Sequence, residues 1–499
     1  MTDDQTEHAS RGPGRAGVAI RGSAVTLMGQ LARFGVQLVA LVALARLLSP
    51  QDFGLVAMVT VITGVAFILG DAGLSMAALQ SRELTHQQRS NLFWLNLGIG
   101  TALGAFVFVL ALPIAQFYDE PDLVPITHAI ACVFPLSGFG AQFRAHVTRQ
   151  LRFTVVAGVD AAAQVIGLAA ALVVALVGLG YWAIVAQQLV VAFVAVVGFV
   201  VSARWWPTRP RKGSDMSGLL GFGVNTTLTQ LLNYASVSVP SVLLGAAWGP
   251  TVLGYYNRAN ALFTMPMAQL AAPITRVVIP VLSATSDPLQ RAEFLARAQK
   301  FISYFLVGIF AALATFADPL VPLVLGDDWR PAVPVLRVLA IGGVFQALAY
   351  VYYWAFVSSA RVGTQLAVML PARLAMIGLA FLGVQWGAVG VAGAVTAGLL
   401  LIWLVNSTIG MRLIGLDAVP LFVASVRPVV VYILIGAAAT GADVLWFASW
   451  PDPARLAAMV GSAAALAAMA WAVPGVRRDI RSIGSSLSTA LKRRRPVPS

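Results

Sequence analysis

The chain has 499 residues, of which 59% are hydrophobic and only 11% charged, and its mean hydropathy is +0.83. A soluble domain carries about a quarter charged residues, so this composition excludes a soluble globular protein and predicts a polytopic membrane protein. The net charge is +13, and the single cysteine, Cys132, excludes an internal disulfide framework and a cysteine metal cluster. The four histidines have no ligand spacing, so we expect neither a metal nor another cofactor.

Apolar stretches of membrane-spanning length follow one another along the chain. A polar, basic cytoplasmic segment over 1–22 precedes the first stretch, which is too long for the core of a cleaved signal peptide and reads as a first span. We predict about fourteen transmembrane helices in an all-α fold. Their ranges are 23–48, 53–78, 92–115, 123–147, 153–178, 181–203, 217–246, 251–283, 299–323, 333–357, 364–384, 386–411, 419–441 and 453–473.

Basic residues gather on one side of this predicted bundle. With the N-terminus in the cytoplasm and the loops alternating, the cytoplasmic segments hold 24 of the 33 basic residues. The outer loops hold Arg46 and Arg330 and are otherwise acidic. This distribution satisfies the positive-inside rule and predicts that both termini are cytoplasmic. The basic tail over 474–499, with "KRRR" at 492–495, is expected to lie solvated near anionic lipid.

The chain contains an internal repeat, seen when it is shifted by 200 residues against itself. Spans 1–6 and 7–12 then form two six-helix bundles over 23–203 and 217–411, joined by a cytoplasmic linker over 204–216. Two extra helices occupy 412–473. Because six is even, both bundles face the same way, as in transporters whose substrate path lies between parallel halves. The matched pairs are Thr26 with Thr226, Gln30 with Gln230, Leu31 with Leu231, Pro50 with Pro250 and Gly54 with Gly254.

Polar side chains line one face of three predicted helices. Facing them to lipid would be costly, so we expect them to border one shared central cavity. Arg258 and Arg276 are predicted on one face, roughly 27 Å apart along span 8. The stripes are Thr26, Gln30, Arg33 and Gln37 in span 1, Thr226, Gln230 and Asn233 in span 7, and Arg258, Gln269 and Arg276 in span 8.

The membrane-embedded charge is mostly positive. Only Asp71 and Asp160 are acidic, and Asp71 is a candidate counter-ion for Arg33, a coupling-proton site or a simple loop-end cap. Arginine stays charged and binds phosphate oxygens in a bidentate fork. Alternatively, each arginine snorkels to an interface or pairs with a carboxylate or carbonyl. The embedded arginines are Arg33, Arg258, Arg276, Arg337, Arg373, Arg427 and Arg455.

Several chemistries have no sequence support. No lysine follows a glycine, so the P-loop of an ATPase is absent. No segment between spans is long enough for a catalytic domain. The acidic pair of "GDDWR" at 326–330 is expected in a solvated outer loop. Aromatic residues such as Tyr255, Trp329 and "YYW" at 352–354 are expected mainly in interfacial belts, with stacking on sugar rings as the alternative.

Several stretches resemble bacterial polysaccharide and O-antigen translocases of the multidrug/oligosaccharidyl-lipid/polysaccharide exporter superfamily. The resemblance runs to about residue 415 and implies two six-helix bundles plus two helices, alternating access and a cationic central cavity. It also implies that Arg33 and Arg258 occupy positions comparable to cavity-lining cations. One departure is Pro240, where many relatives carry an acid. The stretches are "LARLLSPQDFGLVAM" at 44–58, "DAGLSMAALQ" at 71–80, "FWLNLGIG" at 93–100, "FYDEPDL" at 117–123, "LRF" at 151–153, "LGYYNRA" at 253–259 and "LGDDWRPAVPVLRVLA" at 325–340.

The functional hypothesis is a flippase that moves undecaprenyl-pyrophosphate-linked oligosaccharide across the bacterial cytoplasmic membrane for O-antigen or exopolysaccharide biosynthesis. Its substrate-binding residues would be Arg33, Arg258, Arg276, Gln30, Gln37, Gln230, Asn233 and Gln269. The expected partners are this glycan lipid, the bilayer and, in the same pathway, a polymerase or glycosyltransferases, but no nucleic acid. The alternatives are a peptidoglycan-precursor flippase, a drug or metabolite antiporter, a membrane glycosyltransferase or polymerase, and a non-transporting subunit.

Overall fold

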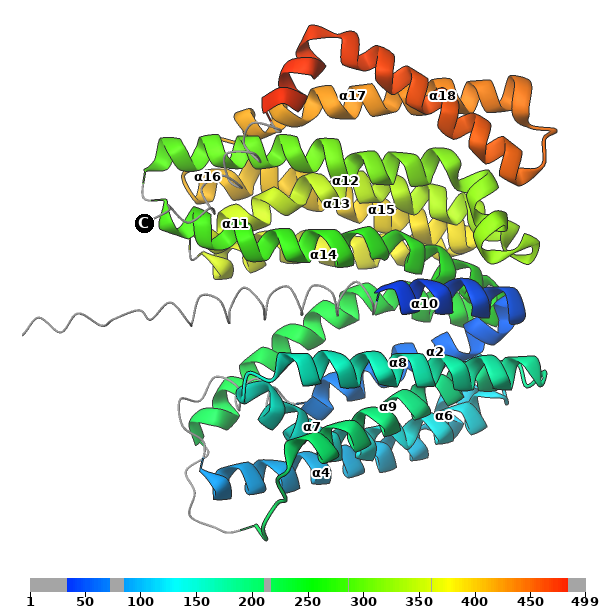
Figure 1. Ribbon diagram of the computed structural model, residues 1–499, viewed down its shortest axis with the longest axis vertical. Helices are drawn as coiled ribbons and strands as arrows, with labels where there is room; N and C mark the ends of the chain where they lie inside the picture. Colours follow the sequence, from blue (N-terminus) through cyan, green and yellow to red (C-terminus); the bar gives the residue numbers. More distant parts are fainter. Residues whose placement is uncertain (1–33, 72–84, 211–216, 286, 360, 483–499) are drawn as a thin grey trace, which may run out of the picture. The chain divides into compact units, whose positions relative to one another are not determined.

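The computed structural model describes residues 34–71, 85–210, 217–285, 287–359 and 361–482, and within these ranges the regular elements are helices (Figure 1). Eleven continuous helices are long and apolar enough to cross a membrane, and a shorter apolar helix covers Phe34–Leu47. Two of the eleven contain a break, at Gly249 and at the turn over Val384–Trp386. Counted at these breaks, the described chain has fourteen apolar segments, which confirms the all-α polytopic fold.

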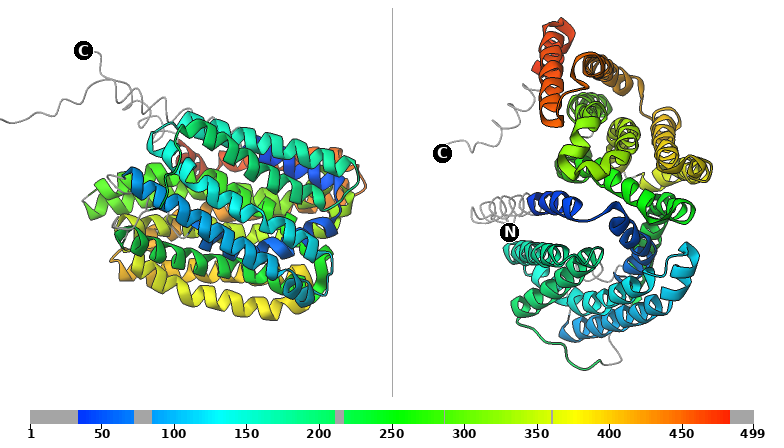
Figure 2. Two further views of the ribbon diagram at one scale, coloured as in Figure 1. Left: turned by 90° about the horizontal axis from the view of Figure 1, so that it is seen from below. Right: turned by 90° about the vertical axis from the view of Figure 1, so that its right-hand side faces the viewer.

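The chain divides into two compact units, and the long helices of each unit run side by side, as their end-on view in Figure 2 shows. In the described chain, unit 1 holds 34–48 and 62–232, and unit 2 holds 49–61 and 233–482. The predicted bundle boundaries stay a prediction. The elements up to residue 203 are α2 (Pro50–Asp71), α4 (His86–Val109), α5 (Ala111–Tyr118), α6 (Leu123–Ala131), α7 (Val133–Arg149), α8 (Phe153–Leu176) and α9 (Trp182–Ala203).

The rest of the chain forms longer helices with more interruptions. Helix α12 begins eleven residues before its predicted span because Pro288 occupies its first turn and the Asp287 side chain caps it by accepting from the Leu289 N–H. The elements are α10 (Ser217–Pro266), η1 (Met267–Ala271), α11 (Ala272–Ala284), α12 (Pro288–Leu325), η2 (Asp327–Ala332), α13 (Val333–Ser358), α14 (Val362–Gly383), η3 (Val384–Trp386), α15 (Gly387–Val405), η4 (Asn406–Gly410), α16 (Met411–Leu413), α17 (Val419–Ala442), η5 (Asp443–Phe447) and α18 (Asp452–Ala472).

Small residues bring the helices of unit 1 into close contact. A methyl group on Gly138 of α7 would overlap the backbone oxygen of Asn96 on α4, and one on Gly140 would meet Val196 of α9. Gly198 of α9 packs in the same way against Val159 of α8. Membrane helices pack through such small residues because lipid offers no hydrophobic force between them.

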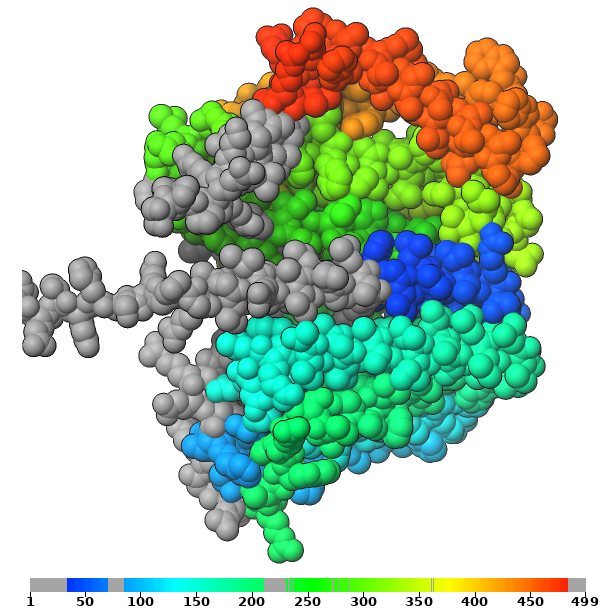
Figure 3. All heavy atoms as spheres, viewed as in Figure 1, coloured from blue at the N-terminus to red at the C-terminus, as the bar shows by residue number. Residues whose placement is uncertain are grey.

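The core of unit 2 lies around α12, α13 and α15, and it contains aromatic side chains that the sequence placed elsewhere. Tyr352 and Trp354 are fully buried on α13, and Trp329 of η2 is fully buried as well. The prediction that these aromatics form an interfacial belt is therefore wrong for these three residues, whereas Asp327 and Asp328 of the predicted solvated loop are exposed. The cause is tertiary packing, which sequence hydropathy does not report. Helices α17 and α18 lie along one edge of unit 2, beside α12 (Figure 3).

In unit 2, two helices cross close to where they begin. These are α2, which begins at Pro50, and the second part of α10, which begins at Pro250. Gly54 lies against the carbonyl of Pro250, and Gly254 lies against the carbonyl of Pro50. At both glycines an added methyl group would overlap the proline oxygen. The four residues are two of the pairs that the 200-residue repeat matches, so this contact joins equivalent points of the two copies.

Replacing Gly254 by alanine should destabilise the protein, because its new methyl group would collide with backbone that cannot rotate away. We expect the free energy of unfolding to fall by about 1–3 kcal/mol, the usual cost of overpacking. The thermal unfolding midpoint in detergent should fall as well. Gly393→Ala is the matched control, since Gly393 lies in α15 with open space at its Cβ position. An equal midpoint for both variants would contradict the crossing.

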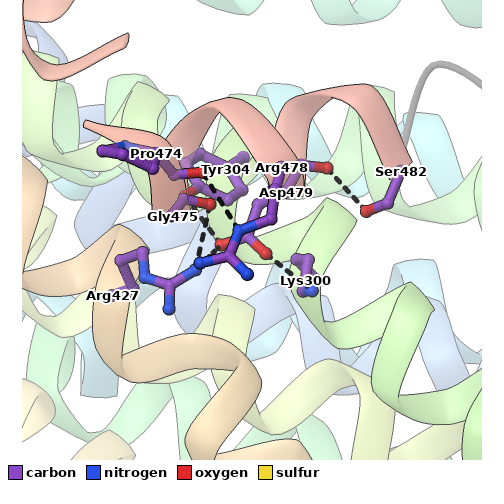
Figure 4. A network of polar contacts seen from close by, with 8 residues as sticks. All are labelled: Lys300, Tyr304, Arg427, Pro474, Gly475, Arg478, Asp479 and Ser482. Carbon is purple, nitrogen blue, oxygen red and sulfur yellow. Dashed lines mark hydrogen bonds and ion pairs between the residues drawn. The ribbon is translucent and has the colours of Figure 1, made fainter. Parts of the chain in front are cut away.

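The start of the predicted basic tail is a short docked helix over 474–482, as Figure 4 shows. Its residue Asp479 is only 6% exposed, and the Asp479 carboxylate lies 2.8 Å from Lys300 Nζ of α12. It also accepts a hydrogen bond of 2.6 Å from Arg427 of α17 and one of 3.3 Å from the Tyr304 hydroxyl. Arg427 also donates to the Gly475 carbonyl at 3.0 Å. The helix is thus attached to two transmembrane helices.

This attachment should hold across neutral and mildly acidic pH. Burial raises the pKa of Asp479, but the hydrogen bonds from Lys300 and Arg427 outweigh it and leave the pKa below its ordinary value. Because the pKa is lowered, the carboxylate fully stabilises docking at any pH above its pKa in the unfolded chain. This stabilisation is lost only as the pH falls through the pKa of the folded state. The rate of trypsin cleavage within 474–482, divided by the rate for an unfolded reference peptide at the same pH, should therefore not change between about pH 5 and pH 8.

Asp479→Asn should increase that cleavage severalfold at neutral pH, because an amide cannot hold two cations. The measurement is the rate of cleavage after Arg477, Arg478 and Arg481, followed by mass spectrometry. Glu293→Gln is the control, since Glu293 forms an exposed ion pair one helical turn from Arg297. Equal protection in Asp479→Asn and the parent protein would show that the carboxylate does not dock the helix.

Candidate functional site

Three sequence stretches that carry the family resemblance meet inside unit 2. Phe53 of α2 contacts Trp329 of η2 edge to face, with ring centroids 5.4 Å apart. Tyr255 of α10 contacts the same indole at 6.2 Å. These residues belong to "LARLLSPQDFGLVAM", "LGYYNRA" and "LGDDWRPAVPVLRVLA", which are far apart in the sequence. The stretches therefore build one aromatic cluster next to the Pro50–Gly254 crossing.

Arg258 lies on this cluster. Its guanidinium carbon is 4.0 Å from the centroid of the Phe53 ring, a cation–π contact. Its Nη2 donates one long hydrogen bond, 3.5 Å, to Asn257 Oδ1. Its Nε is buried and has no hydrogen-bond partner among the described residues. A guanidinium has five N–H donors, so most of the hydrogen-bonding capacity of Arg258 is unused by the described chain.

The other predicted residues of span 8 do not follow the predicted stripe. The structure places Gln269 inside the π-helical turn η1, between Arg258 and Arg276. A π turn holds one residue more than an α turn, and one residue rotates the helix face by about 100°. The prediction that Arg258 and Arg276 share one face is therefore wrong. Arg258 is half-buried and Arg276 is exposed.

Of the remaining predicted residues, only Gln37 and Gln230 have described side chains. Gln37 is half-buried, and Gln230 of α10 is exposed. Gln30 and Arg33 lie outside the described residues. Asp71 ends α2 and Asn233 lies in α10, but their side chains also lie outside the description. The shared central cavity stays a prediction.

Three of the six embedded arginines in the described chain have carboxylate partners. Arg455 forms a bidentate pair with Asp443, with both distances 2.6 Å, and Arg337 pairs with Asp318. Arg427 pairs with Asp479. The alternative interpretation, that an embedded arginine pairs with a carboxylate, therefore holds for these three arginines. Such pairs neutralise charge within the bundle and leave little of it for a ligand.

Arg373 is an embedded arginine that the sequence analysis did not include among the candidate site residues. It lies near the middle of α14, roughly 16 Å from the start of this helix, where a bilayer is least tolerant of charge. It is half-buried, and no carboxylate in the described chain pairs with it. The signal was its mid-span position, which argues against snorkelling to an interface. Arg258, Arg276 and Arg373 are the embedded arginines left without a carboxylate partner in the described ranges.

Unit 1 contains a separate hollow, lined mostly by apolar atoms, that the sequence did not reveal. A cavity of about 340 Å³ lies between α7 and α9, lined by small residues and by Ser137, Arg144 and Thr148. Arg144 forms a bidentate pair with Asp160 of α8, at 3.0 and 2.9 Å, and contacts the ring of Phe199. Arg144 falls within the predicted span 123–147, and helix α7 continues beyond it to Arg149, so Arg144 lies more than a turn from the end of the helix.

The Arg144–Asp160 pair should behave as one unit in a double-mutant cycle. Each single change, Arg144→Ala or Asp160→Ala, should lower the thermal unfolding midpoint, because it leaves one charge unpaired inside the bundle. The double variant should lose less than the sum of the two. We expect a coupling of about 0.5–3 kcal/mol, toward the low end because the Arg144 side chain is 49% exposed. Additive losses would contradict the pairing.

This architecture defines a multi-pass membrane protein. A family model described as a polysaccharide biosynthesis protein matches residues 43–334, which is more than half of the chain. The chain therefore belongs to the polysaccharide biosynthesis protein family, as the resemblance predicted.

Named relatives agree with this family. The chain is 26% identical to the lipopolysaccharide biosynthesis protein WzxC of Escherichia coli (strain K12), over 75% of this chain and 76% of that protein. It is 27% identical to the teichuronic acid biosynthesis protein TuaB of Bacillus subtilis (strain 168), over 57% of this chain and 60% of that protein. It is 25% identical to the succinoglycan biosynthesis transport protein ExoT of Rhizobium meliloti (strain 1021), over 63% of this chain and 64% of that protein. The chain thus spans less than two thirds of the last two relatives.

Solved structures show the same fold. The lipid II flippase MurJ, in an inward closed conformation, matches with a TM-score of 0.68 and 13% identity, over 91% of this chain and 99% of that one. An inward-facing multidrug resistance MATE family transporter matches with a TM-score of 0.61 and 16% identity, over 79% of this chain and 98% of that one. At these identities the likeness concerns the fold alone.

Proposed function

We propose that the protein is a flippase for undecaprenyl-pyrophosphate-linked oligosaccharide in the cytoplasmic membrane of a bacterium, with both termini in the cytoplasm. Family membership and the names of the relatives, which concern lipopolysaccharide, teichuronic acid and succinoglycan, support a lipid-linked glycan as the substrate. The fold shared with a lipid II flippase supports movement across the bilayer. On this proposal the protein transfers no sugar, and sugar transfer by the purified protein would contradict it.

The observation that carries the site proposal is the unused hydrogen-bonding capacity of Arg258. The ring of Phe53 lies on one face of its guanidinium, and its buried Nε has no partner in the described chain. On this proposal its Nη groups donate to the ligand. A pyrophosphate offers oxygens that match this planar fork. Arg33 and Arg373 would supply further positive charge near mid-membrane, and Arg276 would act nearer the far end of span 8.

An organic-cation antiporter fits less well. A cation-binding cavity needs free carboxylates, whereas Asp160, Asp318 and Asp443 each hold an arginine in the described chain. A peptidoglycan-precursor flippase shares the pyrophosphate chemistry and differs in the glycan. Offering lipid II beside a polysaccharide precursor in one assay separates these two functions.

The test is flipping by the purified protein in liposomes, read as exposure of the glycan to a membrane-impermeant lectin. Arg258→Ala should slow flipping roughly tenfold or more, since a charge-assisted hydrogen bond contributes about 1.5–3 kcal/mol. Arg33→Ala and Arg373→Ala should slow it as well. Arg297→Ala is the control, because Arg297 is exposed and pairs with Glu293 on the surface of α12.

Thermal unfolding of each variant separates a binding defect from a folding defect. Unchanged flipping in both Arg33→Ala and Arg258→Ala, with normal unfolding, would show that the site is wrong. Absence of flipping by the parent protein, with lipid II and with a polysaccharide precursor, would contradict the function itself.

A further inference from the structure

Helix 474–482 has two chemically different faces. Val476 and Asp479 face the bundle and are 4% and 6% exposed. Arg477, Arg478 and Arg481 are exposed, and helical geometry places them within about 100° of one another on the opposite face. The helix therefore directs three cations outward and one carboxylate inward.

The docking of Asp479 fixes this orientation. Its carboxylate contacts Lys300 Nζ and an Arg427 nitrogen, and these come from two different transmembrane helices. Tyr304 contributes a third donor, and its backbone carbonyl in turn accepts from the Tyr432 hydroxyl at 2.6 Å. Because one buried carboxylate is held from several directions, the helix cannot rotate its arginines toward the bundle (Figure 4).

Apolar side chains accompany the three arginines. Trp471, Val473 and Ile480 are 48%, 51% and 42% exposed. The Arg477 guanidinium lies 5.1 Å from the Trp471 ring. Trp471 is in the last turn of α18, the final apolar helix of the described chain. Tryptophan at the end of a membrane helix, followed by a basic helix with apolar flanks, is typical of a segment that lies in the lipid headgroup layer.

We propose that helix 474–482 is a binding site for anionic phospholipids, with Arg477, Arg478 and Arg481 holding headgroup phosphates and Trp471, Val473 and Ile480 contacting the acyl boundary. A soluble phosphate ligand would not explain the exposed apolar side chains beside the arginines. The site uses none of the residues proposed to bind the transported glycan. Its consequence is that anionic lipid holds the end of α18 at the membrane surface, and Asp479 links this helix to α12 and α17.

The experiment measures which lipid lies next to the helix. Ile480→Cys, made in a Cys132→Ser background, accepts a fluorophore on the flank of the helix, and the labelled full chain is placed in phosphatidylcholine liposomes. Quenching by nitroxide-labelled phosphatidylglycerol is compared with quenching by nitroxide-labelled phosphatidylcholine. We expect phosphatidylglycerol to quench at least about twofold more strongly, since each basic residue near a membrane attracts anionic lipid.

Replacing the three arginines should remove this preference. The variant Arg477→Gln/Arg478→Gln/Arg481→Gln should give a quenching ratio near one, with the residues beyond 482 unchanged. The matched control, Arg209→Gln/Arg297→Gln/Arg412→Gln, removes three exposed cations elsewhere and should keep the parent ratio. High salt should lower the parent ratio. Equal quenching by both lipids in the parent, or an undiminished preference in the helix variant, would overturn the proposal.

Discussion

The crossing of α2 and α10 is the contact on which unit 2 depends. Pro50 and Gly254 approach through backbone, as do Gly54 and Pro250, and neither glycine has room for a Cβ atom. Proline fixes the start of each helix, and glycine lets the partner backbone reach its carbonyl. The contact joins equivalent positions of the two repeats, so the repeat in the sequence is also a symmetric junction in space.

The aromatic cluster and Arg258 follow from this crossing. Once the two helices are in contact, Phe53 and Tyr255 both reach the buried Trp329, and Arg258 lies on the Phe53 ring. The ring contact orients the guanidinium without neutralising it, whereas Asp443 neutralises Arg455. An oriented cation without a carboxylate partner is suited to an anionic ligand that binds and leaves. Because paired cations stabilise the bundle and unpaired ones are costly within a membrane, the unpaired ones are the better candidates for function.

Composition and periodicity predicted the fold well, since the number and order of apolar segments follow from hydropathy alone. The predicted polar stripe of span 8 is wrong because the π turn at Met267–Ala271, between Pro266 and Pro273, rotates the rest of the helix. No hydropathy pattern marks such a turn. The partners of Arg144 and Arg427 were missed because Asp160 and Asp479 approach them from other helices. The burial of Trp329 was missed for a similar reason, as its loop folds back onto α2. Local sequence thus predicts where helices lie better than which side chains they bring together.

The central claim is that the protein moves a glycan lipid across the bilayer by holding its pyrophosphate. The most direct measurement compares two substrates in liposomes that contain the purified full chain. One is an undecaprenyl-pyrophosphate-linked glycan, and the other carries the same glycan on a lipid without the pyrophosphate. The account predicts protein-dependent flipping of the first and little flipping of the second. Equal rates for both, or no protein-dependent flipping of the first, would contradict it.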